Sequence, residues 1–178
     1  MAIIRYTASA DTTITNAFEA GLVTRGTDSN MGYADSLEVF SIYGQESGST
    51  GQSQELSRIL IQFPIDTIKA NRAANKIPAS GSVSFYLKMF NAETPFTLPQ
   101  DFNLVVAPVS ASWSEGAGLD MDNYQDLGES NWGLRSAGTA WTNDGGDYHT
   151  GSNYNISFPQ GYEDLEHDVS QIVEEWIK

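Results

Sequence analysis

The chain has 178 residues, no cysteine, and 23 acidic against 9 basic residues, which gives a formal net charge of −14. A chain this acidic is repelled by phosphate backbones and by anionic lipid surfaces, so we expect neither nucleic-acid binding nor membrane insertion. The absence of cysteine excludes disulfides, thiolate zinc sites and thiol nucleophiles. The first residues do not resemble a signal peptide, and we expect the chain to reach its place of action without a leader of its own.

Length and composition favour one folded domain over residues 1–178, because aromatic residues make up 11% and hydrophobic residues 40% of the chain. Short apolar stretches alternate with turns rich in Gly, Pro, Asn, Asp and Ser, a pattern typical of all-β proteins. We therefore predict an antiparallel, jelly-roll-like β-sandwich with long loops and one short C-terminal helix. The strands are expected, in chain order, at residues 2–7, 11–18, 37–43, 58–63, 82–90 and 104–109.

Two of these segments carry the clearest pattern. Residues 58–63 form a compact apolar run that Pro64 ends, which predicts a central strand. Residues 82–90 alternate between apolar and polar side chains with the period of a strand. The polar tracts 44–55 and 70–81 are expected to be loops, the second opening with a helical turn.

The last third of the chain differs in composition. Residues 113–154 are rich in Gly, Asp, Asn and Trp with little periodicity, which indicates a long loop region with a functional or interaction role. A helix is predicted at residues 169–177, with Asp168 as its N-cap and Trp176 in the core. Its apolar face groups Leu165, Val169, Ile172, Val173 and Trp176.

Acidic residues gather in this part of the chain, since residues 101–178 hold 14 acidic side chains and only two basic ones. Asp120, Asp122 and Asp126 occupy positions 1, 3 and 7 of one loop, and closely spaced carboxylates are ligands that calcium prefers. The loop departs from the EF-hand pattern, because Gln125 replaces the turn glycine and Asn131 the bidentate glutamate. Two interpretations therefore remain, a structural calcium site and a solvated acidic loop. Residues 144–147 are a second calcium candidate or a tight turn.

Aromatic residues lie between these acids. Rings that stack on sugar faces beside Asp and Asn side chains are typical of carbohydrate-binding proteins. The candidate residues for such a platform are Trp113, Tyr124, Trp132, Trp141 and Tyr148. The alternative is that the rings pin long loops onto the sandwich, which we prefer because tryptophan seldom stays fully exposed.

Catalytic motifs are not recognisable in the chain. His149 and His167 are the only histidines, and neither lies near a nucleophile motif. The sequence contains no nucleophile elbow, metalloprotease motif, phosphate loop or dinucleotide fingerprint. Paired carboxylates for glycoside hydrolysis would occur by chance among 23 acids. We therefore expect a protein that is not an enzyme.

Several segments, in order and spacing, resemble the DNRLRE (disaggregatase-related) domain. These are residues 10–14 (ADTTI), 29–32 (SNMG), 35–39 (DSLEV), 57–63 (SRILIQF), 82–90, 112–116 (SWSEG) and 168–176 (DVSQIVEEW). The chain also resembles virion structural proteins of large tailed marine phages, which share residues 113–122 (WSEGAGLDMD), 131–132 (NW) and 140–147 (AWTNDGGD).

The resemblance implies a β-sandwich related to carbohydrate-binding modules, and a non-enzymatic component of a virion in its tail, neck, fibre or capsid surface. Such a protein lies in the particle and becomes extracellular after release, with other virion subunits as partners. In the family the sandwich continues with further strands after the last helix, so we expect this chain to be incomplete alone or to form a homo-oligomer. The alternative is a carbohydrate-binding module, stabilised by calcium, that recognises host surface glycans.

Overall fold

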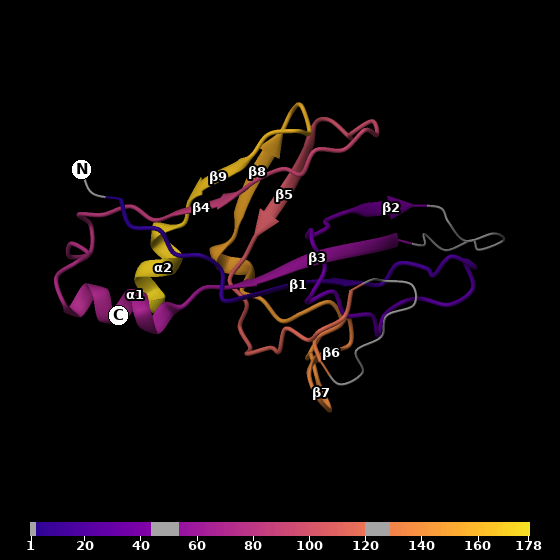
Figure 1. Cartoon of the computed structure of the whole chain (residues 1–178), viewed down its shortest axis with the longest axis horizontal. Helices are drawn as coiled ribbons and strands as arrows, with labels where there is room; N and C mark the ends of the chain where they lie inside the picture. Colours follow the sequence, from indigo (N-terminus) through magenta and orange to yellow (C-terminus); the bar gives the residue numbers. More distant parts are fainter. Residues whose placement is uncertain (1–2, 44–53, 120–128) are drawn as a thin grey trace. The chain divides into compact units, whose positions relative to one another are not determined.

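The computed structural model describes residues 3–43, 54–119 and 129–178 of the chain. In this part of the chain the fold is mainly β, with nine strands in four small antiparallel sheets, two short α-helices and no closed barrel (Figure 1). The contacts divide the chain into two compact units, and the expectation of one domain over residues 1–178 stays a prediction. Unit 1 comprises Met1–Phe63 and Val109–Tyr148, and unit 2 comprises Pro64–Pro108 and His149–Lys178.

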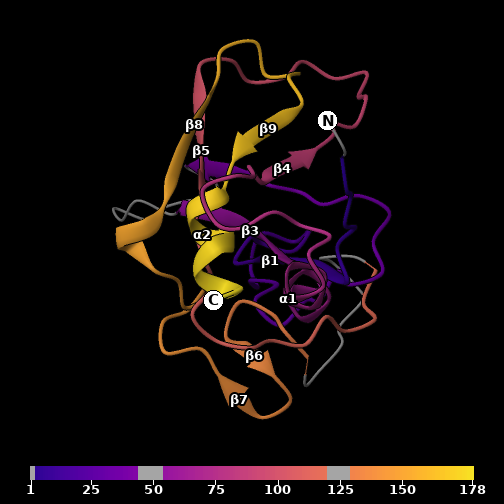
Figure 2. The same cartoon turned by 90° about the vertical axis from the view of Figure 1, so that its left-hand side faces the viewer.

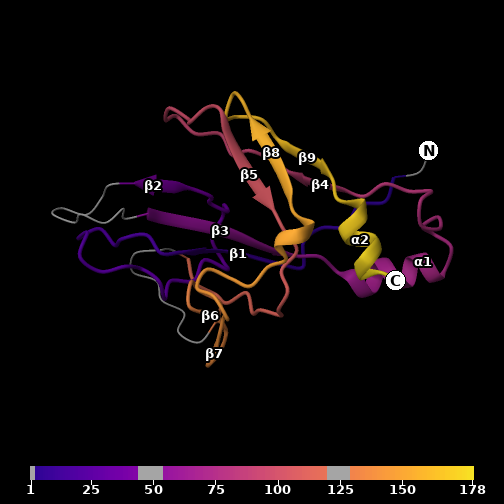
Figure 3. The ribbon, with the colours of Figure 1, turned by 180° about the vertical axis from the view of Figure 1, so that it is seen from behind.

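The main sheet of unit 1 is antiparallel and has the strand order β1-β3-β2 (Figure 3). Its strands are β1 (Ala10–Thr15), β2 (Ser41–Tyr43) and β3 (Gln54–Gln62). β3 lies in the centre, as predicted for residues 58–63, and extends further toward the N-terminus than predicted. β1 confirms residues 11–15 of the strand expected at 11–18, and only the last three residues of the predicted strand 37–43 pair with a neighbour.

Strand β1 carries the β-branched run Thr12, Thr13, Ile14 and Thr15, whose side chains favour the extended backbone and are all buried. Buried hydroxyl groups need hydrogen-bond partners, which two loop segments and the neighbouring strand β3 supply. The backbone N–H of Met31 donates to Thr12 Oγ1 (3.3 Å), that of Glu38 donates to Thr13 Oγ1 (3.0 Å), and Thr15 Oγ1 donates to the Leu56 carbonyl (2.8 Å). The residues after Ser29 are thus tied onto the sheet.

The hydrophobic core of unit 1 lies where the sheet meets the C-terminal segment of the unit. Its buried members are Ile14, Leu60, Trp132 and Trp141, with Trp113 among the half-buried residues packed against them. The region 113–154, which was predicted to be a long loop, contains short regular elements although its sequence shows little periodicity. These elements are β6 (Leu134–Ser136), β7 (Thr139–Ala140) and the 3₁₀ turn η1 (Thr150–Ser152), and β8 (Tyr154–Phe158) begins at the last residue of the region.

Unit 2 contains two antiparallel two-stranded ribbons (Figure 2). One pairs β4 (Tyr86–Met89) with β9 (Leu165–Asp168), and the other pairs β5 (Phe102–Val106) with β8. Phe102 and Phe158 stack across the second ribbon with ring centroids 5.2 Å apart. Tyr154 of β8 meets His167 of β9 edge-on at 4.8 Å, which joins the inner faces of the two ribbons. The strands predicted at 82–90 and 104–109 are confirmed in shorter or shifted form.

Two helices complete unit 2, where the sequence predicted one. α2 (Ser170–Trp176) confirms the predicted C-terminal helix, but its N-cap residue is Val169 and not Asp168. Asp168 ends β9 instead, and its Oδ1 accepts the Ser170 N–H (2.9 Å). α1 (Ile65–Ala73) was predicted only as a helical turn from residue 70, because only Ile68 is buried along it and no apolar stripe marks it. None of the helices in the described ranges is long and apolar enough to cross a membrane.

Two other sequence predictions need correction. Residues 3–7 of the strand expected at 2–7 pair with no other strand in the described part, and Ile3 is 79% exposed. Trp176 was expected in the core but is 44% exposed, while Ile177, directly after α2, is buried. A helix of two turns presents only a short face to its neighbours, and Ile172, Val173 and Ile177 occupy it.

Candidate functional site

The predicted sugar platform is not assembled as a set of open rings. Trp132 and Trp141 are 7% and 5% exposed and belong to the core of unit 1, so neither offers a ring face for stacking on a sugar. Trp113 is half-buried against the same core. These rings pin loop segments onto the sheet, in line with the preferred interpretation. Tyr148 is 43% exposed, and Tyr124 lies outside the described residues.

Asn131 explains why the two buried tryptophans lie where they do. Its Oδ1 accepts the backbone N–H groups of Gly133 (3.0 Å) and Leu134 (2.7 Å), which closes the turn after Trp132. Its carbonyl accepts the indole Nε1–H of Trp141 at 2.9 Å. The polar edge of that indole is therefore satisfied inside the protein, as buried tryptophan requires. Asn131 stands where the EF-hand pattern has its bidentate glutamate, and these hydrogen bonds give it a structural role.

Arg58 is a residue of this region that the sequence did not single out. It projects from β3, and its guanidinium lies over the rings of Trp132 (5.1 Å to the centroid) and Tyr148 (5.2 Å) and donates to the Gly145 carbonyl. An arginine inside an apolar strand needs such partners. The position of Arg58 within an apolar run was therefore the feature of the sequence that could have revealed its role. Gly145 has φ +85°, and a Cβ there would lie 2.8 Å from the Trp132 ring, so the turn at 143–147 requires glycine.

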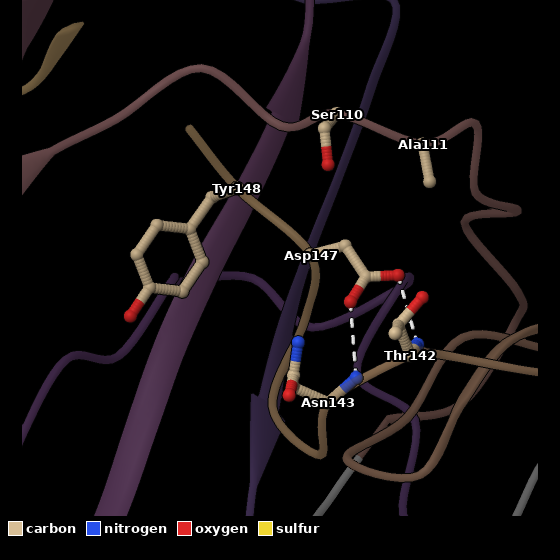
Figure 4. Close-up of a pocket in the computed structure, with 6 residues that line it drawn as sticks. All are labelled: Ser110, Ala111, Thr142, Asn143, Asp147 and Tyr148. Atoms are coloured by element: carbon tan, nitrogen blue, oxygen red, sulfur yellow. Dashed lines mark hydrogen bonds between the residues drawn. The ribbon is translucent and has the colours of Figure 1, made fainter. Parts of the chain in front are cut away.

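This turn borders an open pocket of about 370 Å³ in unit 1 (Figure 4). The pocket is lined by Ser110, Ala111, Thr142, Asn143, Asp147 and Tyr148. Figure 4 shows the Tyr148 ring on one side and the Asp147 carboxylate beside Thr142 and Asn143. Hydroxyl, amide and carboxylate groups beside one exposed ring are suited to holding a small polar molecule through hydrogen bonds.

Asp147 is fixed by the backbone of the same turn. Its Oδ2 accepts the N–H of Thr142 (2.8 Å) and its Oδ1 accepts the N–H of Asn143 (3.0 Å). The backbone hydrogen bond from Thr142 is the main cause that lowers the pKa of Asp147. Burial opposes it as the second-largest effect, and the bond from Asn143 adds to the lowering. The carboxylate therefore stays ionised in neutral solution. Its bonding to N–H groups fits the tight-turn interpretation of residues 144–147.

The calcium candidate of Asp120, Asp122 and Asp126 lies outside the described residues. Elsewhere in the described chain, no three His, Asp or Glu side chains are placed to hold a metal ion together. Asp11 and Glu115 form a smaller acidic pair in unit 1, where Glu115 Oε1 accepts the Asp11 N–H (2.7 Å). Burial first, and the Glu115 charge second, raise the pKa of Asp11.

Asn30 is the second residue whose importance the sequence did not reveal. It lies fully buried where three loop segments of unit 1 meet. Its Nδ2 donates to the carbonyls of Glu115 and Ser130, both at 2.7 Å. Its Oδ1 accepts the N–H groups of Gly32 (3.1 Å) and Gly118 (2.9 Å). The amide thus joins the 29–32 and 112–116 segments, which were recognised separately in the sequence.

Comparison with known proteins adds no relative to this description: no protein family, curated protein or solved structure matches the chain.

Proposed function

We propose that the chain is a non-enzymatic structural component of a tailed-phage particle and acts through protein–protein contacts. The observation that carries the proposal is the number of open sheet edges. Among the nine described strands, only β3 has a hydrogen-bonded strand on both sides. Each of the others leaves one edge of its backbone unpaired by any strand of residues 3–43, 54–119 and 129–178, and such edges are templates for pairing with a neighbouring chain.

The small size of the sheets supports the same conclusion. Two-stranded ribbons such as β4–β9 and β5–β8 are marginally stable in isolation and gain stability from further strands or from packing. We infer that neighbouring subunits, including copies of this chain, extend these sheets into the β-sandwich that the DNRLRE resemblance implies. The protein would then lie in the virion and become extracellular when the particle is released.

Mass spectrometry of purified particles tests this function. We expect peptides of the chain at a constant ratio to a major capsid or tail protein through successive density gradients. The control is a host protein of similar size and charge, whose ratio should fall with each gradient. A chain that is lost from the particles together with this host protein would contradict the proposal.

A second candidate function is carbohydrate recognition at the Tyr148 pocket. It is favoured by the exposed Tyr148 ring beside Thr142, Asn143 and Asp147. Glycan-array binding that is lost in Tyr148→Ala and kept in Tyr33→Ala, which removes an exposed tyrosine elsewhere in unit 1, would support it. Trp132→Ala and Trp141→Ala are unsuitable tests, because both would disrupt the core. An array without signal in the presence of calcium would contradict it.

A further inference from the structure

The β4–β9 ribbon of unit 2, whose course Figure 2 shows, and the residue after β4 carry exposed aromatic side chains. Along the first strand and the residue after it, Tyr86, Lys88 and Phe90 are exposed and alternate with half-buried Leu87 and Met89. Tyr86 is 54% and Phe90 83% exposed. The strand period therefore places two aromatic rings and one ammonium group on the side that faces away from the second ribbon.

Carboxylates occupy the neighbouring positions of the same face. Asp168 lies opposite Tyr86 and Glu166 opposite Lys88 in the register of β9. Exposed Asp164 precedes the strand, and Tyr162, 65% exposed, lies two residues earlier. We call this set the aromatic–acidic face, and its members are Tyr86, Lys88, Phe90, Tyr162, Asp164, Glu166 and Asp168.

The only basic group of the face is already paired. Lys88 Nζ lies 2.7 Å from Glu166 Oε2, which leaves the charges of Asp164 and Asp168 in excess. The pKa of Asp168 is lowered, first by its hydrogen bond with the Ser170 side chain and then by the Ser170 N–H. A ligand for this face must therefore bring positive charge.

The two loops at the end of the face are fastened to each other. The Asn91 N–H donates to Asp164 Oδ1 (2.9 Å), and Asn91 Nδ2 donates to the Gly161 carbonyl (3.0 Å). These bonds hold the segment that bears Phe90 beside the segment that bears Tyr162. The rings are thus exposed on an ordered backbone, which lowers the entropy lost when a partner docks.

We propose that the aromatic–acidic face binds an arginine-bearing segment of a basic partner protein. This proposal rests on the proposed function of the chain as an assembly component. A guanidinium group stacks on aromatic rings and bonds carboxylates in a fork, so it matches both kinds of group on the face. A second copy of this chain is a poor occupant, because it carries a net charge of −14 and would oppose like charges at this acidic face.

The two units allow specific docking to be separated from diffuse charge attraction. Unit 1 holds 14 acidic and 4 basic residues, whereas unit 2 holds 9 acidic and 5 basic residues. A cationic peptide that follows net charge alone would therefore collect on unit 1. A peptide that recognises the aromatic–acidic face would bind unit 2 despite its lower charge.

The test uses the full chain and the synthetic peptide acetyl-Gly-Arg-Ser-Arg-Ser-Arg-Gly-amide, with a lysine version of equal charge as comparison. Alternating arginines point to one side of an extended peptide and can meet a strand face. We expect amide shifts in NMR spectra at residues 86–90 and 162–168, and weaker binding of the lysine peptide. Each removed ring should weaken arginine-peptide binding by about two- to fivefold.

Phe90→Ala with Tyr162→Ala is the informative variant, and Tyr33→Ala is its matched control. Tyr33 lies in unit 1 and is as exposed as Tyr162, at 65%. If the double variant loses its native spectrum, Tyr86→Ala alone takes its place. Equal affinity of variant and control, or shifts confined to unit 1, would overturn the docking proposal. Neither result would affect the detection of the chain in purified particles, so the two proposals fail separately.

Discussion

Asn30 contributes to unit 1 through hydrogen bonds rather than through buried apolar area. The four backbone groups that it satisfies lie in segments that are far apart in sequence, near residues 32, 115–118 and 130. A carboxamide provides two donors and an acceptor that takes two bonds, which is the number this position needs. An aspartate in its place would lack the donors and would bring a buried charge.

We expect Asn30→Ala to destabilise the protein by about 3 kcal/mol or more, because it leaves four backbone groups without this partner, two of them in buried and two in part-buried hydrogen bonds. Urea unfolding followed by tryptophan fluorescence measures the loss. The control is Asn103→Ala, which removes an exposed amide on β5 and should change stability by less than about 0.5 kcal/mol. Equal effects of the two variants would contradict the structural role of Asn30.

The raised pKa of Asp11 leads to a second prediction about a single residue. Burial and the neighbouring Glu115 raise its pKa above the ordinary value of 3.8, so the folded state binds a proton more readily than the unfolded state. The protonated form therefore stabilises the fold below that ordinary value, and this contribution is lost as the pH rises through the raised pKa. At neutral pH the ionised group is unfavourable.

We expect Asp11→Asn to raise the melting temperature at pH 7 relative to the wild type, and to give no gain near pH 3. Melting curves between these two pH values measure the difference. Asp147→Asn should behave in the opposite way, because backbone N–H groups lower the pKa of Asp147 and its ionised form stabilises the fold. A variant of Asp11 that is less stable at neutral pH would show that the carboxylate has a favourable role.

The two helices of unit 2 are joined by an ion pair between their facing sides. The Arg72 guanidinium donates from both terminal nitrogens to the Glu174 carboxylate, at 3.0 Å and 2.7 Å. The side chains are only 18% and 14% exposed, and Arg72 also lies over the Phe85 ring, with 5.9 Å from Cζ to the centroid. The hydrogen bond with Arg72 is the main cause that lowers the pKa of Glu174. This contact fastens α1, whose own apolar face is small.

A double-mutant cycle of Arg72→Met and Glu174→Leu should give a coupling energy of about 1.5–3 kcal/mol, as for charged hydrogen bonds that are largely shielded from water. The pair Lys88 and Glu166 is the matched control in the same unit, with both side chains 56% exposed. Its cycle should give about 0.2–1 kcal/mol, because water screens exposed ion pairs. Similar coupling energies in both cycles would contradict the role that we assign to burial.

The strands show how far the pattern of apolar and polar residues along the sequence predicts secondary structure. Residues 58–63 were correctly assigned to the central strand β3, because a compact apolar run of this length is typical of a buried strand. Within this run the pairing partner is β1, whereas β2 pairs with residues 54–56. β6, β7, β8 and β9 were missed. β6, β7 and β9 have two to four residues, too few to show a period, whereas Tyr154, Ile156 and Phe158 of β8 alternate with polar residues and were an available signal. The helix α1 carries an acid in its first turn and a base in its last, but Ile68 alone could not produce an apolar stripe.

The whole molecule carries an excess of negative charge, which the two units share unequally at −10 and −4. Repulsion among these charges opposes the compact state, and salt screens it. We expect the melting temperature to rise as NaCl increases from about 10 mM to 100 mM, over which the screening length falls from about 30 Å to 10 Å. A melting temperature that falls with salt would instead show that attractive ion pairs dominate.

The effect of calcium on the stability of the whole molecule distinguishes the two interpretations of the loop that carries Asp120, Asp122 and Asp126. At equal ionic strength, CaCl₂ should raise the melting temperature beyond NaCl only where a site binds the ion in the folded chain. The gain should vanish in Asp120→Asn with Asp122→Asn if these carboxylates are the ligands. Equal melting temperatures in both salts would indicate a solvated loop.

The sequence by itself determined the mainly-β character, the central strand and the C-terminal helix, because these depend on local propensity and on periods along the chain. It also identified the charge asymmetry and the aromatic composition of the C-terminal half. Only the tertiary structure decided which rings are open. Trp132 and Trp141 turned inward because Ile14 and Leu60 offered a core, while Phe90 and Tyr162 stayed exposed on a two-stranded ribbon. Burial is a property of residues that meet across long distances in sequence, such as Asn30 with Ser130, and no local pattern records it.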